Sequence, residues 1–156
     1  MTIGPFTHKY AFLSNFYQCP VKFEGVVYKS VEHAYQAAKL EEPAMRSWIG
    51  RSFHAHQAKA NAKTLKSSWR KDWMEIRVDV MEVLLRSKFS DRKLRDRLVK
   101  TGDEEIVEIN SHHDQFWGVH NKQGQNMLGK LLMKLREEYG NEHTAEISPD
   151  ADSGSC

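Results

Sequence analysis

The stretch SSWRKDWMEIRVDVMEVLLRSK, residues 67–88, carries the clearest secondary-structure signal in the chain and decides its fold class. Its apolar residues recur at steps of three and four, the spacing that places side chains on one face of an α-helix. The expected stripe consists of Trp69, Trp73, Ile76, Val80, Val83 and Leu84. The pattern therefore predicts an amphipathic helix from about Ser68 to Lys88.

Three shorter helices are predicted before this stretch. Ser30 is suited to the N-cap of a helix over VEHAYQAAKL, residues 31–40, and Glu32 is favourable in its first turn. Pro43 suits the first turn of a short second helix. Residues 54–66 are rich in alanine and lysine and contain no helix breaker, so they are expected to form the third.

Two more helices and a strand are predicted after it. Ser90 can cap a helix over DRKLRDRLVK, residues 91–100, which should stop near Gly102. The alternation in EEIVEIN, residues 104–110, is typical of a short strand. The last helix is predicted over LGKLLMKLREEYG, residues 128–140.

A β-hairpin is predicted near the N-terminus, because β-rich segments flank Gly25 in FYQCPVKFEGVVYKS, residues 16–30. Glycine accepts the positive φ of a tight turn. We therefore predict an α+β fold over residues 1–140, a compact, mainly helical single domain with a small antiparallel sheet. The tail, residues 141–156, is polar and acidic, and is expected to be disordered.

The composition is that of an ordinary globular protein, with 40% hydrophobic and 28% charged residues among 156. No apolar run approaches the roughly 20 residues of a membrane span. The first residues lack the apolar core of an export signal. The two cysteines are Cys19 and Cys156, and a disulfide to a mobile tail is not expected. A cytoplasmic protein without membrane contact is predicted.

The charge is distributed unevenly although the net charge is only +2. Residues 51–100 contain 14 lysines and arginines against 6 acidic residues, whereas residues 101–156 contain 4 against 11. A basic central region can attract phosphate-rich partners. The alternative is that solvated helix faces carry these charges without a partner.

The segment NSHHDQFWG, residues 110–118, combines a carboxylate with two aromatic rings. Partial desolvation beside Phe116 and Trp117 would alter the reactivity of Asp114. Aromatic faces also offer a stacking surface for a base. The alternative is structural, with the rings anchoring a loop and Asp114 capping a turn.

The predicted helix within SVEHAYQAAK, residues 30–39, places Glu32 and Lys39 on one face. Seven residues turn through about 700°, so the two side chains point within roughly 20° of each other. They are about 10 Å apart along the axis, too far for a direct pair. Both can reach one ligand along that face, with Tyr35 and Gln36 between them. The alternative is a solvated face without a role.

Two further features of the sequence bear on metal and phosphate binding. The pairs His54–His56 and His112–His113, with Asp114, are residue types that bind metal ions. No CxxC or HExxH pattern supports a metal site, so no metal is expected.

The segment KQGQNMLG, residues 122–129, opens a helix with two glycines. Backbone amides at such a helix start bind phosphate, although the spacing matches no P-loop and an asparagine there commonly acts as a cap.

Five motifs in order resemble the YbiA-like, or NADAR (NAD- and ADP-ribose-associated), domain family. They are FLSNFY (12–17), SVEHAYQAAK (30–39), SSWRKDWMEIRVDVMEVLLRSKF (67–89), NSHHDQFWG (110–118) and GQNMLGKLLMKLRE (124–137). Each motif is short, but five with similar spacers are specific. The resemblance covers about residues 5–140.

The resemblance implies an N-glycosidase that cleaves the bond between a base and a ribose and needs no cofactor. The favoured substrate is ADP-ribose attached to guanine in nucleic acid, because the centre of the chain is basic. The alternatives are a ribosylaminopyrimidine phosphate of riboflavin biosynthesis and a non-catalytic sensor of ADP-ribose or NAD.

The resemblance also implies roles for individual residues. The family's acidic positions fall on Glu32, as general acid or base, and on Asp114, as a second acid or an anchor for sugar hydroxyls. Its lysine falls on Lys39, as nucleophile or phosphate contact. The expected substrate-binding residues are Asn15, Phe16, Trp73, Trp117, Gly118, Gly124, Asn126 and Gly129. The family's arginine-containing central run is replaced here by lysines, with Lys59, Lys63 and Arg70 as possible phosphate contacts.

Overall fold

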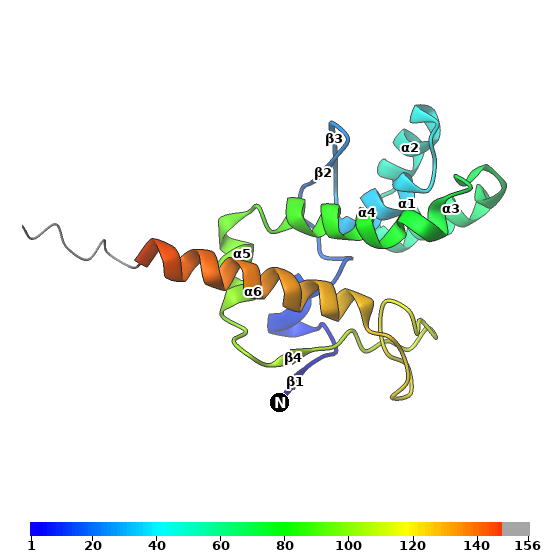
Figure 1. Cartoon of the computed structure of the whole chain (residues 1–156). Coiled ribbons are helices and arrows are strands. Elements are labelled where there is room, and N and C mark those ends of the chain that lie inside the picture. The colour runs from blue at the N-terminus through cyan, green and yellow to red at the C-terminus, as the bar shows by residue number, and fades with distance from the viewer. Residues whose placement is uncertain (148–156) are drawn as a thin grey trace, which may run out of the picture.

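The computed structural model describes residues 1–147, which are mainly helical (Figure 1). The α-helices are α1 (Val31–Ala38), α2 (Pro43–Gly50), α3 (Ala55–Thr64), α4 (Trp73–Lys88), α5 (Arg92–Val99) and α6 (Met127–Ile147), and short 3-10 helices span His8–Leu13 and Lys66–Ser68. Strand β2 (Val21–Phe23) pairs antiparallel with β3 (Val26–Tyr28), and β1 (Thr2–Ile3) pairs in parallel with β4 (Glu105–Ile106). The prediction of a mainly helical α+β fold is confirmed.

Helix α1 lies at the centre of the core, and all eight of its residues are buried. It packs against α2, α3 and α4, and Figure 1 shows α2 and α3 beside it at one end of the molecule. Helix α6 packs against α4, α5 and β4. The loop between β4 and α6 lies at the same end as α1 and α3 (Figure 1), so segments distant in sequence approach each other there.

Several local predictions are confirmed because short-range chemistry decides them. The Ser30 hydroxyl accepts the backbone N–H of His33 at 3.1 Å and so caps α1. Pro43 is the first residue of α2, where its missing N–H costs nothing. The hairpin turns at Glu24 and Gly25, whose φ angles are +47° and +82°.

The predicted start of the long helix is wrong by five residues. Helix α4 begins at Trp73, and Trp69 precedes it in an extended conformation. Two tertiary hydrogen bonds draw this segment away from helical geometry. The indole N–H of Trp69 donates to the Ala62 carbonyl at 2.8 Å, and the Arg70 N–H donates to the Lys39 carbonyl at 2.8 Å. The predicted stripe is wrong also at Val83, which is 51% exposed.

Two helix ends differ from prediction. Asp91, not Ser90, caps α5, since its carboxylate accepts the Leu94 N–H at 3.0 Å. Helix α6 continues to Ile147, so the expectation of disorder from residue 141 is wrong for residues 141–147. An ion pair between Arg95 and Glu142, at 3.2 Å, joins this extension to α5.

The remaining differences concern the sheets and the tail. The parallel pairing of β1 with β4 was not predicted, because two-residue strands far apart in sequence leave no local pattern. The rest of the predicted tail, residues 148–156, and with it Cys156, lies outside the described residues. None of the helices in residues 1–147 is long and apolar enough to span a membrane.

Candidate active site

A cavity of about 200 Å³ opens between α1, α3, α4 and the loops at residues 15–16 and 108–117. Its lining residues are Asn15, Phe16, Glu32, Tyr35, Gln36, Lys39, Lys59, Met81, Glu108, His112, Asp114 and Trp117. Six of the predicted catalytic and substrate-binding residues therefore meet at one place, among them both predicted acids and the predicted lysine. Two other hollows, along α5 and α6, contain none of the predicted site residues.

Helix α1 supplies one wall of the cavity through Glu32, Tyr35, Gln36 and Lys39. These positions follow the three- and four-residue spacing of one helix face. Glu32 is only 6% exposed, and the Gln36 side-chain N–H donates to its Oε1 at 2.7 Å. Burial raises the pKa of Glu32, whereas the Gln36 hydrogen bond and the nearby lysines oppose that rise. The predicted shared face is confirmed, and it points into a cavity instead of solvent.

Three aromatic rings surround the ammonium group of Lys39. Their centroids lie 4.1 Å (Trp69), 5.2 Å (Tyr35) and 5.9 Å (Trp73) from its Nζ. Lys39 makes no ion pair with any described residue. Burial lowers its pKa to about 8, although the charge of Glu32 favours the protonated form. About a tenth of this amine is therefore neutral, and nucleophilic, at pH 7, far more than for a lysine with the ordinary pKa of 10.5.

The loop after β4 holds Asp114 firmly. Its Oδ1 accepts the backbone N–H groups of Phe116 and Trp117 at 3.0 and 2.9 Å. The side chain of Asn110 bonds the main chain of Asp114 at both its N–H and its carbonyl. Asp114 therefore caps a turn, as the structural alternative held, and it also lines the cavity. The Trp117 indole N–H donates to the Tyr35 hydroxyl at 3.2 Å, which joins the loop to α1.

Five predicted substrate-binding residues do not line the cavity: Trp73, Gly118, Gly124, Asn126 and Gly129. Trp73 lies in the core behind Lys39 and is 4% exposed. At the three glycines a Cβ would collide with a neighbouring backbone carbonyl, of Glu108, Gly118 and Ile106 in turn. Glycine is needed there for close backbone approach.

The predicted phosphate contact through the Asn126 amide is contradicted, since that N–H donates to the Gly118 carbonyl at 3.3 Å. The next two amides of α6, those of Met127 and Leu128, also donate to loop carbonyls, each at 3.0 Å. The Asn126 side chain bonds the Glu108 N–H at 3.0 Å and the Ile106 carbonyl at 2.9 Å. The first backbone N–H groups of α6 therefore bind carbonyls of the preceding loop instead of pointing toward a ligand.

Sequence reasoning missed Glu108, which lines the cavity. Burial raises its pKa to about 7, and the charges of Asp114 and Glu32 act in the same direction. A signal was available, because the alternation of a strand places Glu108 on the same face as Ile106, which is fully buried. His112, weighed earlier as a metal ligand, also lines the cavity, and residues 1–147 contain no group of three or more His, Cys, Asp or Glu placed to hold a metal ion.

Three buried oxygen atoms in the cavity wall have no hydrogen-bond partner among the described residues. They are Asn15 Oδ1, Gln36 Oε1 and Glu108 Oε2. An unpaired buried polar atom costs about 1–3 kcal/mol, so proteins seldom keep one without a function. The cavity is thus suited to a ligand with several hydrogen-bond donors.

Comparison with known proteins identifies the family of this chain. The model of the NADAR domain matches residues 4–139 of the chain. The chain belongs to the NADAR domain family. The resemblance inferred from its five motifs is therefore confirmed.

Among relatives of this NADAR domain, an N-glycosidase of Nostoc punctiforme is 36% identical over 137 residues, covering 85% of this chain and 87% of that protein. The N-glycosidase YbiA of Escherichia coli (strain K12) is 35% identical over 132 residues, covering 83% and 81%. A riboflavin biosynthesis protein of Vibrio vulnificus is 39% identical over 131 residues, but the chain spans only 35% of its length. The NMR structure of Escherichia coli YbiA superposes with a TM-score of 0.81 at 30% identity, covering 97% of this chain and 90% of that one.

Proposed function

We propose that this NADAR domain is an N-glycosidase that hydrolyses the C–N bond between a base and a ribose. The observation that carries the proposal is a cavity lined by Glu32 and Lys39 together with Asn15 and Gln36, whose side-chain oxygens are unpaired among the described residues. The hydroxyl groups of a ribose are donors of the kind these oxygens need. Relatives named N-glycosidases, which match most of the chain, support the same reaction.

Cleavage of an N-glycosidic bond develops positive charge on the sugar ring. In the direct route, Glu32 stabilises this charge and orients a water molecule, whose oxygen bonds to the anomeric carbon. The electron pair of the C–N bond passes to the nitrogen of the base, which takes up a proton. Asp114 anchors the sugar hydroxyls, because its Oδ1 is already held by two amides and the residue lines the cavity.

Lys39 offers a second route through a Schiff base. When the sugar ring opens, the neutral amine of Lys39 adds to the anomeric carbon and the base departs as an amine. Water then hydrolyses the imine and restores the lysine. The aromatic rings around its Nζ, and a pKa of about 8, supply the neutral amine that this route needs.

The size of the cavity favours a ribose with its base at the entrance. Its volume of about 200 Å³ is below the roughly 300–1,000 Å³ typical of sites for drug-sized ligands. Phe16, which is 46% exposed at the cavity edge, offers a ring on which the base stacks, beside the more buried Trp117. Lys59 on α3 supplies a positive charge for a phosphate on the sugar.

Two substrate classes fit this arrangement. Lys59 and Lys63 lie one helical turn apart on α3, within the basic central region, and favour ADP-ribose attached to guanine in nucleic acid. The names of relatives in Vibrio vulnificus and Arabidopsis thaliana, both riboflavin biosynthesis proteins, favour a ribosylaminopyrimidine phosphate. Either substrate presents a phosphorylated ribose bonded to nitrogen.

The test is to incubate the protein with each substrate and measure the released base by mass spectrometry. Glu32→Gln should retain binding and lose turnover, whereas the control Glu41→Gln, at an exposed position before α2, should behave as the parent does. Binding of ADP-ribose without any release of base would favour the non-catalytic sensor. Release from neither substrate, with no binding, would refute the proposal.

A further inference from the structure

We infer that Glu108 is a catalytic residue, the proton donor to the departing base, in the reaction proposed above. The inference rests on that proposed function, and it assigns the proton to a third carboxyl group of the cavity. Glu32 and Asp114 then keep the roles toward the sugar that are proposed above.

The backbone around Glu108 is held on both sides. Its N–H donates to the Asn126 side chain at 3.0 Å, and its carbonyl accepts the Val119 N–H at 2.7 Å. Gly118 lies against Glu108 so closely that a Cβ there would collide with the Glu108 carbonyl. A general acid must be held within reach of the atom it protonates, and these contacts supply such a fixed position.

The hydrogen bonds of the three carboxyl groups distinguish them. Glu32 Oε1 accepts from the Gln36 amide, and Asp114 Oδ1 accepts two backbone N–H groups. Glu108 Oε2 is buried and has no donor among residues 1–147. Because hydrogen bonds from donors stabilise the ionised form of a carboxyl group, their absence at Glu108 Oε2 favours the protonated form of Glu108.

The charges facing Glu108 act in the same direction. Asp114, from the loop, and Glu32, from α1, disfavour a third negative charge, and only Lys59, from α3, opposes them. Burial also raises the pKa of Glu32, although the Gln36 hydrogen bond and the charges of Lys59 and Lys39 oppose that rise. Together with burial, the charges of Asp114 and Glu32 raise the pKa of Glu108 to about 7, near the value at which an acid transfers protons best under neutral conditions.

The proposed step balances in atoms and electrons. As the bond between the anomeric carbon and the base breaks, its electron pair goes to nitrogen, which takes the proton of Glu108. The oxygen of the attacking water bonds to the anomeric carbon, and the proton that this water releases restores Glu108. No oxidant or cofactor enters the step.

The test compares two leaving groups in the parent and in Glu108→Gln. The aminopyrimidine of ribosylaminopyrimidine phosphate needs a proton to leave, whereas the nicotinamide of nicotinamide riboside phosphate leaves as a neutral molecule. General acid catalysis contributes about 10²–10⁴-fold, so kcat/KM for the first substrate should fall at least about 100-fold. For the second it should fall less than about threefold. An equal loss on both substrates, or no loss on either, would overturn the inference.

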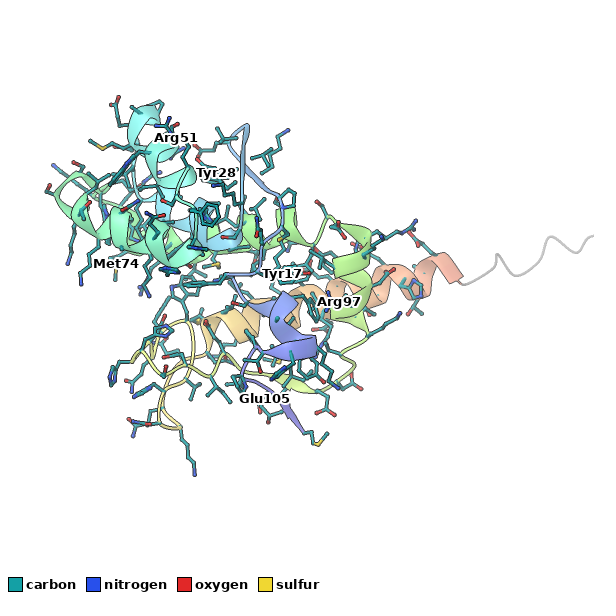
Figure 2. All side chains as sticks on the ribbon, turned by 180° about the vertical axis from the view of Figure 1, so that it is seen from behind. Tyr17, Tyr28, Arg51, Met74, Arg97 and Glu105 are labelled. Atoms are coloured by element: carbon teal, nitrogen blue, oxygen red, sulfur yellow. The ribbon has the colours of Figure 1, made fainter. Side chains whose placement is uncertain are left out.

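Glu105→Gln is the matched control. Glu105 lies on β4, three residues from Glu108, and is exposed at the edge of the molecule, where Figure 2 labels it. This variant should hydrolyse both substrates as the parent does.

A measurement without turnover separates this inference from the proposed function. In the protein labelled with ¹³C at glutamate side chains, the carboxyl carbon of Glu108 should titrate near pH 7, and Glu108→Gln should assign that signal by removing it. Titration of Glu108 near the ordinary glutamate value of about 4.3 would refute its role as proton donor. A parent protein that releases no base from any substrate would refute the proposed function, whatever the titration shows.

Discussion

Lys88 provides a test of the structure that needs no substrate. It is 1% exposed at the end of α4, and its ammonium group donates to the Ser14 carbonyl at 2.8 Å. The rings of Tyr17 and Phe89 lie 5.6 and 5.4 Å from its Nζ, and Figure 2 labels Tyr17 in the middle of the molecule. Ser14 precedes Asn15 in the cavity wall, so Lys88 holds one edge of the site.

Burial lowers the pKa of Lys88 from 10.5 to about 8. Between these two values the unfolded chain binds more protons than the folded protein, so the free energy of unfolding rises with pH. For one such group the rise from pH 7 to pH 9 is about 1.3 kcal/mol, taking 1.36 kcal/mol for each pH unit between the two pKa values. Burial of the charged form destabilises the protein below pH 8, and this destabilisation is relieved as the pH increases.

The assay is urea unfolding of the parent and of Lys88→Met at pH 7 and at pH 9. The increase between the two pH values should be about 1.3 kcal/mol smaller in Lys88→Met than in the parent, since contributions from Lys39 and from other groups that do not interact with Lys88 cancel in the comparison. Cys19 does interact with Lys88, so both proteins carry Cys19→Ser. The control Lys93→Met, at an exposed position on α5, should keep the parent's increase. If Lys88→Met fails to fold, the ¹³C titration of the lysine Cε carbons gives the pKa directly. Equal increases in Lys88→Met and the parent, or a Lys88 that titrates near 10.5, would refute this account.

Three further predictions follow from the same structure. Lys39→Met should abolish the adduct that borohydride traps between the protein and an open-chain ribose phosphate, as measured by mass spectrometry. In the parent, the yield of this adduct should increase from pH 7 to pH 9 as the amine of Lys39 loses its proton. An unchanged yield in Lys39→Met would contradict the Schiff-base route. Asn126→Ala should lower the free energy of unfolding in urea by about 1–3 kcal/mol, because the buried Glu108 N–H loses its acceptor; no loss would show that the loop closes by other contacts. Ser30→Ala should lower it by about 1 kcal/mol, because the His33 N–H loses its cap, and Ser30→Thr should restore most of this loss.

The sequence alone determined the elements whose signals are local. Capping at Ser30, proline at Pro43 and a glycine turn at Gly25 are interactions within four residues, so they form wherever the segment lies. Hydrophobic periodicity likewise predicted α4, although not its first residue. It also placed Glu32 and Lys39 on one face of α1, because helical geometry is independent of what that face contacts.

Only the tertiary structure decided what that face contacts. Helix α4 starts at Trp73 because Trp69 and Arg70 bond to Ala62 and Lys39, partners that no local pattern identifies. The parallel pairing of β1 with β4 likewise depends on segments that are far apart in the sequence and meet only when the chain collapses.

The site depended on the same long-range packing. Glu108 lines the same cavity as Glu32 and Asp114, although it is distant from Glu32 in the sequence. The side chain of Asn126, expected as a phosphate contact, accepts a hydrogen bond from the Glu108 N–H. The local sequence specifies the backbone conformation of a segment and the functional groups that its side chains carry. Burial, and with it the protonation of a carboxyl group or a lysine, depends on neighbours that are brought together only when the whole chain folds.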